Sequence, residues 1–227
     1  MVKIFIDSAD LDEIRQAFEW NIVDGITTNP SLMKKAVDAH PSEKAHLKKY
    51  LTQVLKTAKG TSVSLEVTGT TTEEMISQAK KLYKQFKPIT DNIYMKIPIN
   101  PAFKDSDTTH FDGIKTIREL TKAKIKTNCT MIFTPEQALL AAKAGACIVS
   151  PYVGRVDDYI RKSNKIKFKK TDYFPDTGMS KGSKHLHDNG VYSGIDLVAQ
   201  IVRIFKYYDL KTQVLAASLR NIRQVRK

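Results

Sequence analysis

The chain has 227 residues, of which 41% are hydrophobic, and a formal net charge of +13 at pH 7. This length and composition allow one α/β domain with a full core. No apolar run reaches the roughly 18 residues of a membrane-spanning helix, so no membrane partner is expected. Only Cys129 and Cys147 occur, far apart in sequence, which argues against a disulfide framework or a zinc site.

Short β-rich runs alternate with helix-like segments along the chain. We predict strands at 3–7, 25–28, 62–67, 93–98, 126–133, 147–153 and 213–218. Helices are predicted between them at 12–20, 71–86 and 134–145. This alternation is typical of a parallel sheet, and seven repeats favour a TIM (β/α)8-type barrel over a doubly wound sheet.

Two of these helices have clear end signals. Thr71 and Glu74 have the spacing of a capping box. Thr134 is a predicted N-cap, followed by Pro135 in the first turn, and Gly145 is the predicted stop.

The segment from about 157 to 192 breaks this rhythm, because it is polar, lysine-rich and contains glycines. Loops after barrel strands lie at the catalytic face, so we predict a long active-site loop within one domain spanning 1–227. A disordered basic insert is the alternative. Only nine residues follow position 218, so we expect the eighth strand and the closing helix to be absent.

The predicted strand 93–98 contains a lysine, Lys96, within the apolar run NIYMKIPIN. A charged ammonium at such a position is costly unless it is paired or loses its proton. A lysine near a strand end can also reach water with its ammonium group, and that is the simpler interpretation of a lone lysine.

The other predicted strands also end in polar groups, which a purely structural barrel does not need. Because functional side chains of a barrel gather at the carboxyl ends of its strands, these residues form one candidate site. They are Asp7, Thr27, Asn29, Ser64, Glu66, Lys96, Asn128, Thr130, Ser150, Tyr152, Arg155, Ser218 and Arg220.

These residue types predict a mechanism. Burial favours the neutral amine of a lysine, which can attack a ketone and form a Schiff base. The iminium is an electron sink for cleavage of the adjacent C–C bond, with Asp7 and Glu66 as available acid/base groups. Thr130 would hold a water, and the amides of Asn29 and Asn128 would bind sugar hydroxyls. The remaining cations, with one hydroxyl, would clamp a phosphate: Arg155, Arg220 and Ser218.

Six segments resemble signature segments of the transaldolase family, class I aldolases that fold as TIM barrels. They are IDSAD, GITTNPSL, YMKIP, TNCTMIF, SPYVGR and AASLRN, in order from Asp7 to Asn221. The resemblance implies that Lys96 forms the Schiff base, that Asp7 is the acid/base for C–C cleavage, and that Glu66 and Thr130 position the catalytic water. It also implies that the sugar chain is bound by Thr27, Asn29, Asn128 and Ser150. The phosphate would be bound by Arg155, Ser218 and Arg220.

The resemblance further implies a cytoplasmic transaldolase of the pentose phosphate pathway, which moves a dihydroxyacetone unit from a ketose phosphate to an aldose phosphate. No metal or organic cofactor is expected. The partners would be phosphorylated sugars. Homo-oligomers occur in the family, and the sequence leaves this chain's oligomeric state open.

Two features depart from the family pattern. Tyr152 stands where transaldolases usually carry phenylalanine and fructose-6-phosphate aldolases tyrosine, whereas Glu66 stands where those aldolases usually carry glutamine. The family also continues past AASLRN. A fructose-6-phosphate aldolase, and an inactive truncated barrel with a basic binding surface, therefore stay open as alternatives. RNA-binding signatures are absent, so nucleic acid is not an expected partner.

Overall fold

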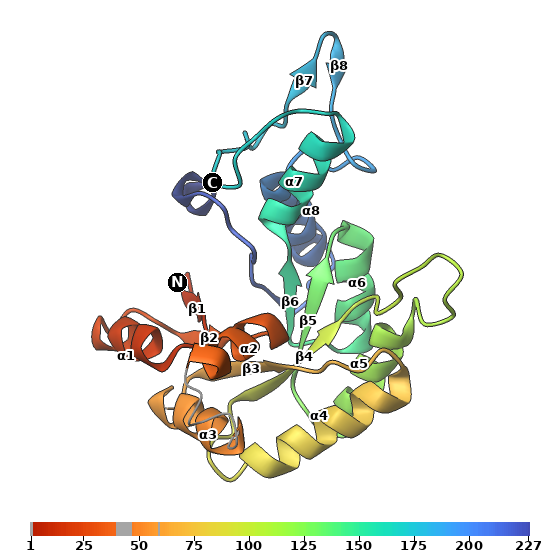
Figure 1. The fold of residues 1–227 in the computed structure, drawn as a ribbon. Helices are drawn as coiled ribbons and strands as arrows, with labels where there is room; N and C mark the ends of the chain where they lie inside the picture. Colours follow the sequence, from red (N-terminus) through yellow and green to blue (C-terminus); the bar gives the residue numbers. More distant parts are fainter. Residues whose placement is uncertain (1, 40–46, 59) are drawn as a thin grey trace.

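The fold is a parallel α/β sheet that curls into an open barrel, as seen in a computed structural model that describes residues 2–39, 47–58 and 60–227 (Figure 1). The seven-stranded sheet has the order β1-β2-β3-β4-β5-β6-β9, and its neighbouring strands are parallel. The strands are β1 (Phe5–Asp7), β2 (Gly25–Thr27), β3 (Ser62–Glu66), β4 (Ile93–Pro98), β5 (Thr127–Ile132), β6 (Ile148–Pro151) and β9 (Gln213–Val214). All seven predicted strands are therefore present, with β9 shorter than expected.

The sheet stays open between its first and last strands. Within the described residues, β1 pairs with β2 alone and β9 with β6 alone. This arrangement agrees with the prediction of a barrel without its eighth strand.

Helices cover the outer face of the sheet (Figure 1). They are α1 (Leu11–Glu19), α2 (Pro30–Ala39), α3 (Leu47–Thr57), α4 (Thr72–Phe86), α5 (Asp112–Lys122), α6 (Pro135–Ala144), α7 (Val153–Ser163) and α8 (Gly194–Tyr207). The Thr71–Glu74 capping box is present at the start of α4. Thr134 caps α6, which ends at Gly145 with a φ of 103°, a backbone conformation that glycine adopts without strain. Both end predictions are confirmed.

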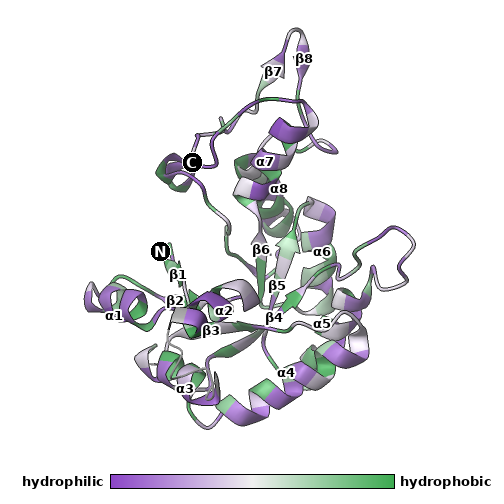
Figure 2. Ribbon diagram, viewed as in Figure 1, coloured by the Kyte–Doolittle hydropathy of each residue, from purple (hydrophilic) through white to green (hydrophobic). Residues whose placement is uncertain are grey.

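The core lies between the sheet and the helices. Ile93, Met95 and Ile97 of β4 are fully buried and alternate with residues that face the barrel interior. On the helix side, Ile117 and Leu120 of α5 are equally buried. Figure 2 shows the corresponding pattern of hydrophobic inner and hydrophilic outer helix faces. Each such side chain contributes about 1.5–3 kcal/mol through burial, so the strands that carry the site rest on a rigid support.

The predicted loop at 157–192 begins later than expected, because α7 continues to Ser163. The rest of the segment projects from the barrel and contains a hairpin of β7 (Ser180–Lys181) and β8 (Lys184–His185) (Figure 1). Buried Arg161 of α7 anchors it, donating to the carbonyls of Asp172 and Tyr173 at 3.2 and 2.8 Å. The structure therefore shows a folded insert instead of the disordered alternative.

In the part of the chain that the structure describes, every helix is too short or too polar to cross a membrane.

Candidate active site

The candidate site forms around three residues that are neighbours on adjacent strands of the sheet. Strand register places Glu66 of β3 beside Lys96 of β4, and Lys96 beside Asn128 of β5. Because parallel neighbours in register point the same way, these three side chains reach the same part of the barrel interior.

Lys96 is buried and paired. The residue is 4% exposed, and its Nζ lies 3.1 Å from Oε2 of Glu66. Nζ also donates to the backbone carbonyl of Thr28 at 3.1 Å. The lysine in the apolar strand thus does not reach out to water, and its burial is compensated by two oxygen partners.

Glu66 is the proton acceptor nearest to this amine. Burial raises the pKa of the Glu66 carboxyl above its ordinary value, and the Asp7 carboxylate acts in the same direction, whereas Lys96 lowers it. A carboxyl with a raised pKa takes up a proton more readily. The pair can therefore convert an ammonium–carboxylate contact into a neutral amine beside a carboxylic acid.

Asp7 lies at the end of β1, on the open side of the barrel. Its Oδ1 accepts a hydrogen bond of 2.8 Å from the hydroxyl of Thr27, which holds this carboxylate oxygen in place. Asn29 plays a different local part, because its Oδ1 accepts from the N–H of Leu32 and so caps the start of α2. The predicted sugar-binding role of Asn29 would therefore use its amide nitrogen.

A chain of buried hydrogen bonds connects β6, β5 and β3 inside the barrel, past β4. Ser150 donates to Oδ1 of Asn128 at 2.8 Å, and Nδ2 of Asn128 donates to the hydroxyl of Ser64 at 3.1 Å. All three side chains are at most 1% exposed. The chain holds the Asn128 amide in one orientation beside Lys96.

Thr130 and Tyr152 contact each other across the site. The Thr130 hydroxyl donates to the Tyr152 hydroxyl at 3.2 Å. The register of β5 and β6 shifts between Cys129 and Ile132, and Met131 has a φ of 59°, so β5 bulges next to Thr130. This bulge places the threonine opposite the tyrosine.

The phosphate candidates lie where α7 meets the segment after β9. The N–H of Gly154 donates to the Ser218 carbonyl at 3.0 Å, which brings Ser218 beside the start of α7. Arg155 is exposed and lies over the Tyr152 ring, 5.6 Å from its centroid. Arg220 donates instead to Oδ2 of Asp158 at 3.1 Å. Asp158 is not among the site residues predicted from the sequence. Its position three residues after Arg155 on α7 is the one signal in the sequence that it lies near the phosphate candidates.

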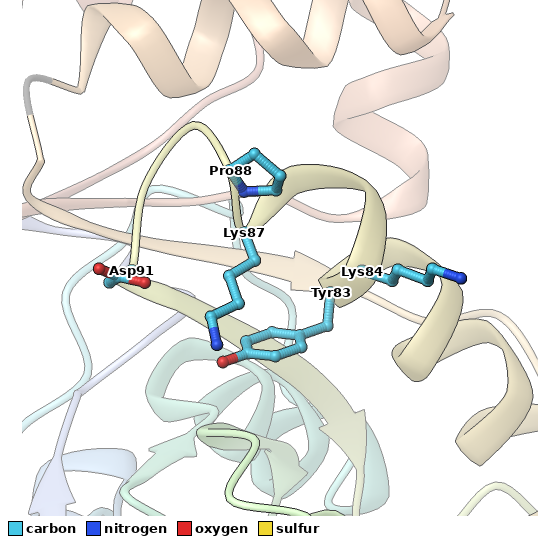
Figure 3. A pocket seen from close by; sticks show the side chains of 5 residues that line it. All are labelled: Tyr83, Lys84, Lys87, Pro88 and Asp91. Atoms are coloured by element: carbon cyan, nitrogen blue, oxygen red, sulfur yellow. The ribbon is translucent and has the colours of Figure 1, made fainter.

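Two surface hollows lie away from these residues. One of about 480 Å³ is lined by Tyr83, Lys84, Lys87, Pro88 and Asp91, with Lys87 over the Tyr83 ring (Figure 3). The other, of about 250 Å³, includes Phe5, Ser62, Tyr94 and Ile148 at the amino ends of four strands. Both lie toward the amino ends of strands, opposite the end that carries Lys96 and Glu66, so neither is the candidate site.

The side chains that could bind a metal ion are not clustered in the described part of the chain. Among residues 2–39, 47–58 and 60–227, no three His, Cys, Asp or Glu side chains form a group that could hold a metal ion. The histidine of the hairpin, His185, contacts the Thr177 carbonyl at 2.8 Å and stacks on Tyr192.

Comparison of the sequence with known proteins shows which family the chain belongs to. The profile of the transaldolase/fructose-6-phosphate aldolase family matches residues 4–227. A protein of Thermoplasma acidophilum described as "Probable transaldolase" is 37% identical over 223 residues, covering 97% of this chain and 76% of that protein. One of Parabacteroides distasonis with the same description is 37% identical over 225 residues, covering 99% of this chain and 80% of that protein. The chain belongs to the transaldolase/fructose-6-phosphate aldolase family.

Proposed function

We propose that this chain is a transaldolase, which transfers a dihydroxyacetone unit from a ketose phosphate to an aldose phosphate through a Schiff base on Lys96. The observation that supports this proposal most directly is the buried Lys96–Glu66 pair, 3.1 Å apart. Schiff-base chemistry requires a neutral amine, and a carboxylate in contact with the amine can remove its proton. The names of the relatives, "Probable transaldolase", support the same reaction.

The first half-reaction uses the two carboxylates in turn. Glu66 accepts a proton from Lys96, and the amine attacks the ketone carbon of the donor sugar. Loss of the carbonyl oxygen as water leaves an iminium. Asp7 then removes the proton of the C4 hydroxyl while the C3–C4 bond breaks, and the bonding electrons move into the iminium. The aldose phosphate leaves and an enamine stays on Lys96.

The second half-reaction reverses these steps with another aldose phosphate. The enamine carbon attacks the aldehyde, and Asp7 returns its proton to the new hydroxyl. Water then releases the longer ketose phosphate from Lys96. No metal or organic cofactor is required, because the iminium itself accepts the electrons.

Substrate positioning falls to the polar groups around the pair. The buried Asn128, held by Ser64 and Ser150, would bind a hydroxyl of the sugar chain. Arg155, Ser218 and Arg220 would bind the terminal phosphate, since guanidinium groups match phosphate geometry.

One contact favours a second candidate, a fructose-6-phosphate aldolase that releases free dihydroxyacetone. The Tyr152 hydroxyl lies 3.2 Å from the Thr130 hydroxyl, and together these two groups could hold a water near the imine. A well-held water would hydrolyse the adduct before a second aldose arrives.

The test combines reductive trapping on one portion of the enzyme with a transfer assay on a second, unreduced portion. Borohydride with fructose 6-phosphate should leave a stable adduct on Lys96, located by peptide mass spectrometry. In the unreduced portion, fructose 6-phosphate together with erythrose 4-phosphate should yield a seven-carbon ketose phosphate faster than free dihydroxyacetone appears. Release without transfer would favour the aldolase, and no adduct at all would favour an inactive barrel.

A further inference from the structure

The segment that follows β9 carries two of the three phosphate candidates, and we call residues 217–227 the arginine arm. Ala217 forms a bridge with Tyr152, and the carbonyls of Ala217 and Ser218 accept from Val153 and Gly154, both at 3.0 Å. Ser218 has a φ of 59°, a costly conformation for a serine. Such a backbone persists only where surrounding contacts hold it.

One buried side chain holds the residues of the arm that follow Ser218. Gln224, 6% exposed, lies in the 3₁₀ turn η2 (Ile222–Arg226). Its Oε1 accepts from the N–H groups of Arg220 and Asn221 at 2.7 and 3.1 Å. Its Nε2 donates to Oδ2 of Asp157 at 2.7 Å. The amide thus connects the backbone of the phosphate candidate Arg220 to helix α7.

Asp157 is the fixed end of this connection. It is 2% exposed, and its Oδ1 accepts from the N–H of Gly194 at the start of α8 at 2.7 Å. Both carboxylate oxygens therefore receive N–H donors, one from α8 and one from the arm. Two contacts at the rim attach the arm to the folded insert as well: Asn221 donates to the Thr171 carbonyl at 3.1 Å, and Lys227 lies 3.3 Å from Asp176 (Figure 1).

We propose that Gln224 and Asp157 are positioning residues for phosphate recognition, and that they hold the arginine arm so that Arg220 and Ser218 face the substrate phosphate. The proposal rests on the proposed function of these two residues. Neither Gln224 nor Asp157 touches the substrate. They act through the backbone of Arg220, whose guanidinium is oriented separately by Asp158.

The donor and acceptor roles of the Gln224 side chain in this connection can be tested. Two backbone donors fix the Gln224 oxygen, so its nitrogen must face an acceptor, which the ionised Asp157 provides. Around Asp157, the N–H of Gly194, the Arg161 guanidinium and Gln224 favour the ionised form, while Asp158 opposes it. Burial nevertheless raises the pKa of Asp157 to about 6. A protonated Asp157 weakens the connection, because a carboxyl O–H would compete with an N–H donor.

The experiment compares Gln224→Ala with Gln200→Ala, which removes a glutamine of α8 whose contacts lie outside the arm. Inorganic phosphate binding is measured by calorimetry. KM is measured for fructose 6-phosphate and for unphosphorylated fructose. Gln224→Ala should weaken phosphate binding and raise KM for the phosphorylated sugar roughly tenfold, the size expected when a charged hydrogen bond is lost. KM for fructose and kcat should stay within about twofold, and Gln200→Ala should match the wild type.

Gln224→Glu gives a readout that simple loss of packing does not. Protonated, the introduced carboxyl reproduces the amide, with an oxygen toward the arm and an O–H toward Asp157. Ionised, it faces a carboxylate. Phosphate binding relative to wild type should therefore be close to normal at pH 6.5, where one proton shared by the two carboxyls keeps the connection, and should fall at pH 8, where two carboxylates repel each other. Equal losses for phosphate and fructose, or a ratio independent of pH, would overturn the proposal.

Failure of the proposed function gives a different result. In that case borohydride leaves no adduct on Lys96 in the wild type, whatever the arm does. If the wild type forms the adduct with unphosphorylated dihydroxyacetone and Gln224→Ala binds phosphate as tightly as the wild type, only the positioning role is wrong. If the wild type forms the adduct but does not bind inorganic phosphate, both the phosphate clamp and its positioning residues are wrong.

Discussion

The two halves of the candidate site are held in place by different forces. Lys96 and Glu66 lie on neighbouring strands whose register is set by backbone hydrogen bonds and by the buried outer face of β4. The arginine arm lies beyond the last strand and is held largely by side chains, above all Gln224 and Asp157. A single substitution at Lys96 or Glu66 should therefore abolish or slow the reaction while the strands stay in place. A single substitution in the support of the arginine arm should displace the candidate phosphate-binding groups while the groups themselves remain.

The largest effect is expected at the lysine itself. Lys96→Ala should abolish borohydride trapping and lower turnover by at least about a thousandfold, because no other nucleophile would form the iminium. Phosphate binding should persist, since the arm is separate from the lysine. Trapping is followed by mass spectrometry, and an adduct on the alanine variant would place the nucleophile elsewhere.

Glu66→Gln tests the proton transfer within the pair. Glutamine keeps the shape of the side chain but cannot accept the proton, so Schiff-base formation should slow about 100-fold at neutral pH. Because burial raises the pKa of Glu66, the wild-type rate should fall as pH drops through that raised pKa, where the carboxyl becomes protonated. The rate of the glutamine variant should lack this descent. Stopped-flow measurement of both profiles checks it, and superimposable profiles would assign the proton to another group.

Arg220→Ala tests the second half of the site. KM for fructose 6-phosphate should rise about 10- to 100-fold, and KM for unphosphorylated fructose should change little, because a charge-assisted contact to phosphate is worth about 1.5–3 kcal/mol. Borohydride trapping with dihydroxyacetone is the control for an intact Lys96. Equal losses with both sugars would contradict a phosphate role for this arginine.

The smallest effect is expected at Tyr152, which lies between the halves. Tyr152→Phe removes the hydroxyl that contacts Thr130, so release of free dihydroxyacetone should fall several-fold while transfer to erythrose 4-phosphate stays within about twofold. Both products are measured with one enzyme preparation, so a folding defect would lower them together. If the ratio of release to transfer does not change, Glu66 becomes the next residue to exchange.

Local signals in the sequence were sufficient for most of the sheet. The apolar runs at 62–67 and 93–98 predicted β3 and β4, and Thr71 and Thr134 predicted where α4 and α6 begin. These signals are short-range, since alternation, capping and glycine stops act within a few residues. The helix after β6 was missed, because its polar, charged sequence resembles a loop and its buried residues pack on distant parts of the chain.

The residue types of the candidate site were equally visible in the sequence, because polar groups at the ends of apolar strands stand out. Their pairing was not visible. The contact of Lys96 with Glu66 depends on strand register, the capping role of Asn29 on the start of α2, and the Arg220–Asp158 pair on how a segment after β9 meets α7. Gln224 lies 67 residues from its partner Asp157, and only the folded chain brings them together. The sequence alone determined which groups are available and which strands carry them. The tertiary structure decided which groups are partners, because burial and hydrogen-bond direction depend on residues far away in the chain.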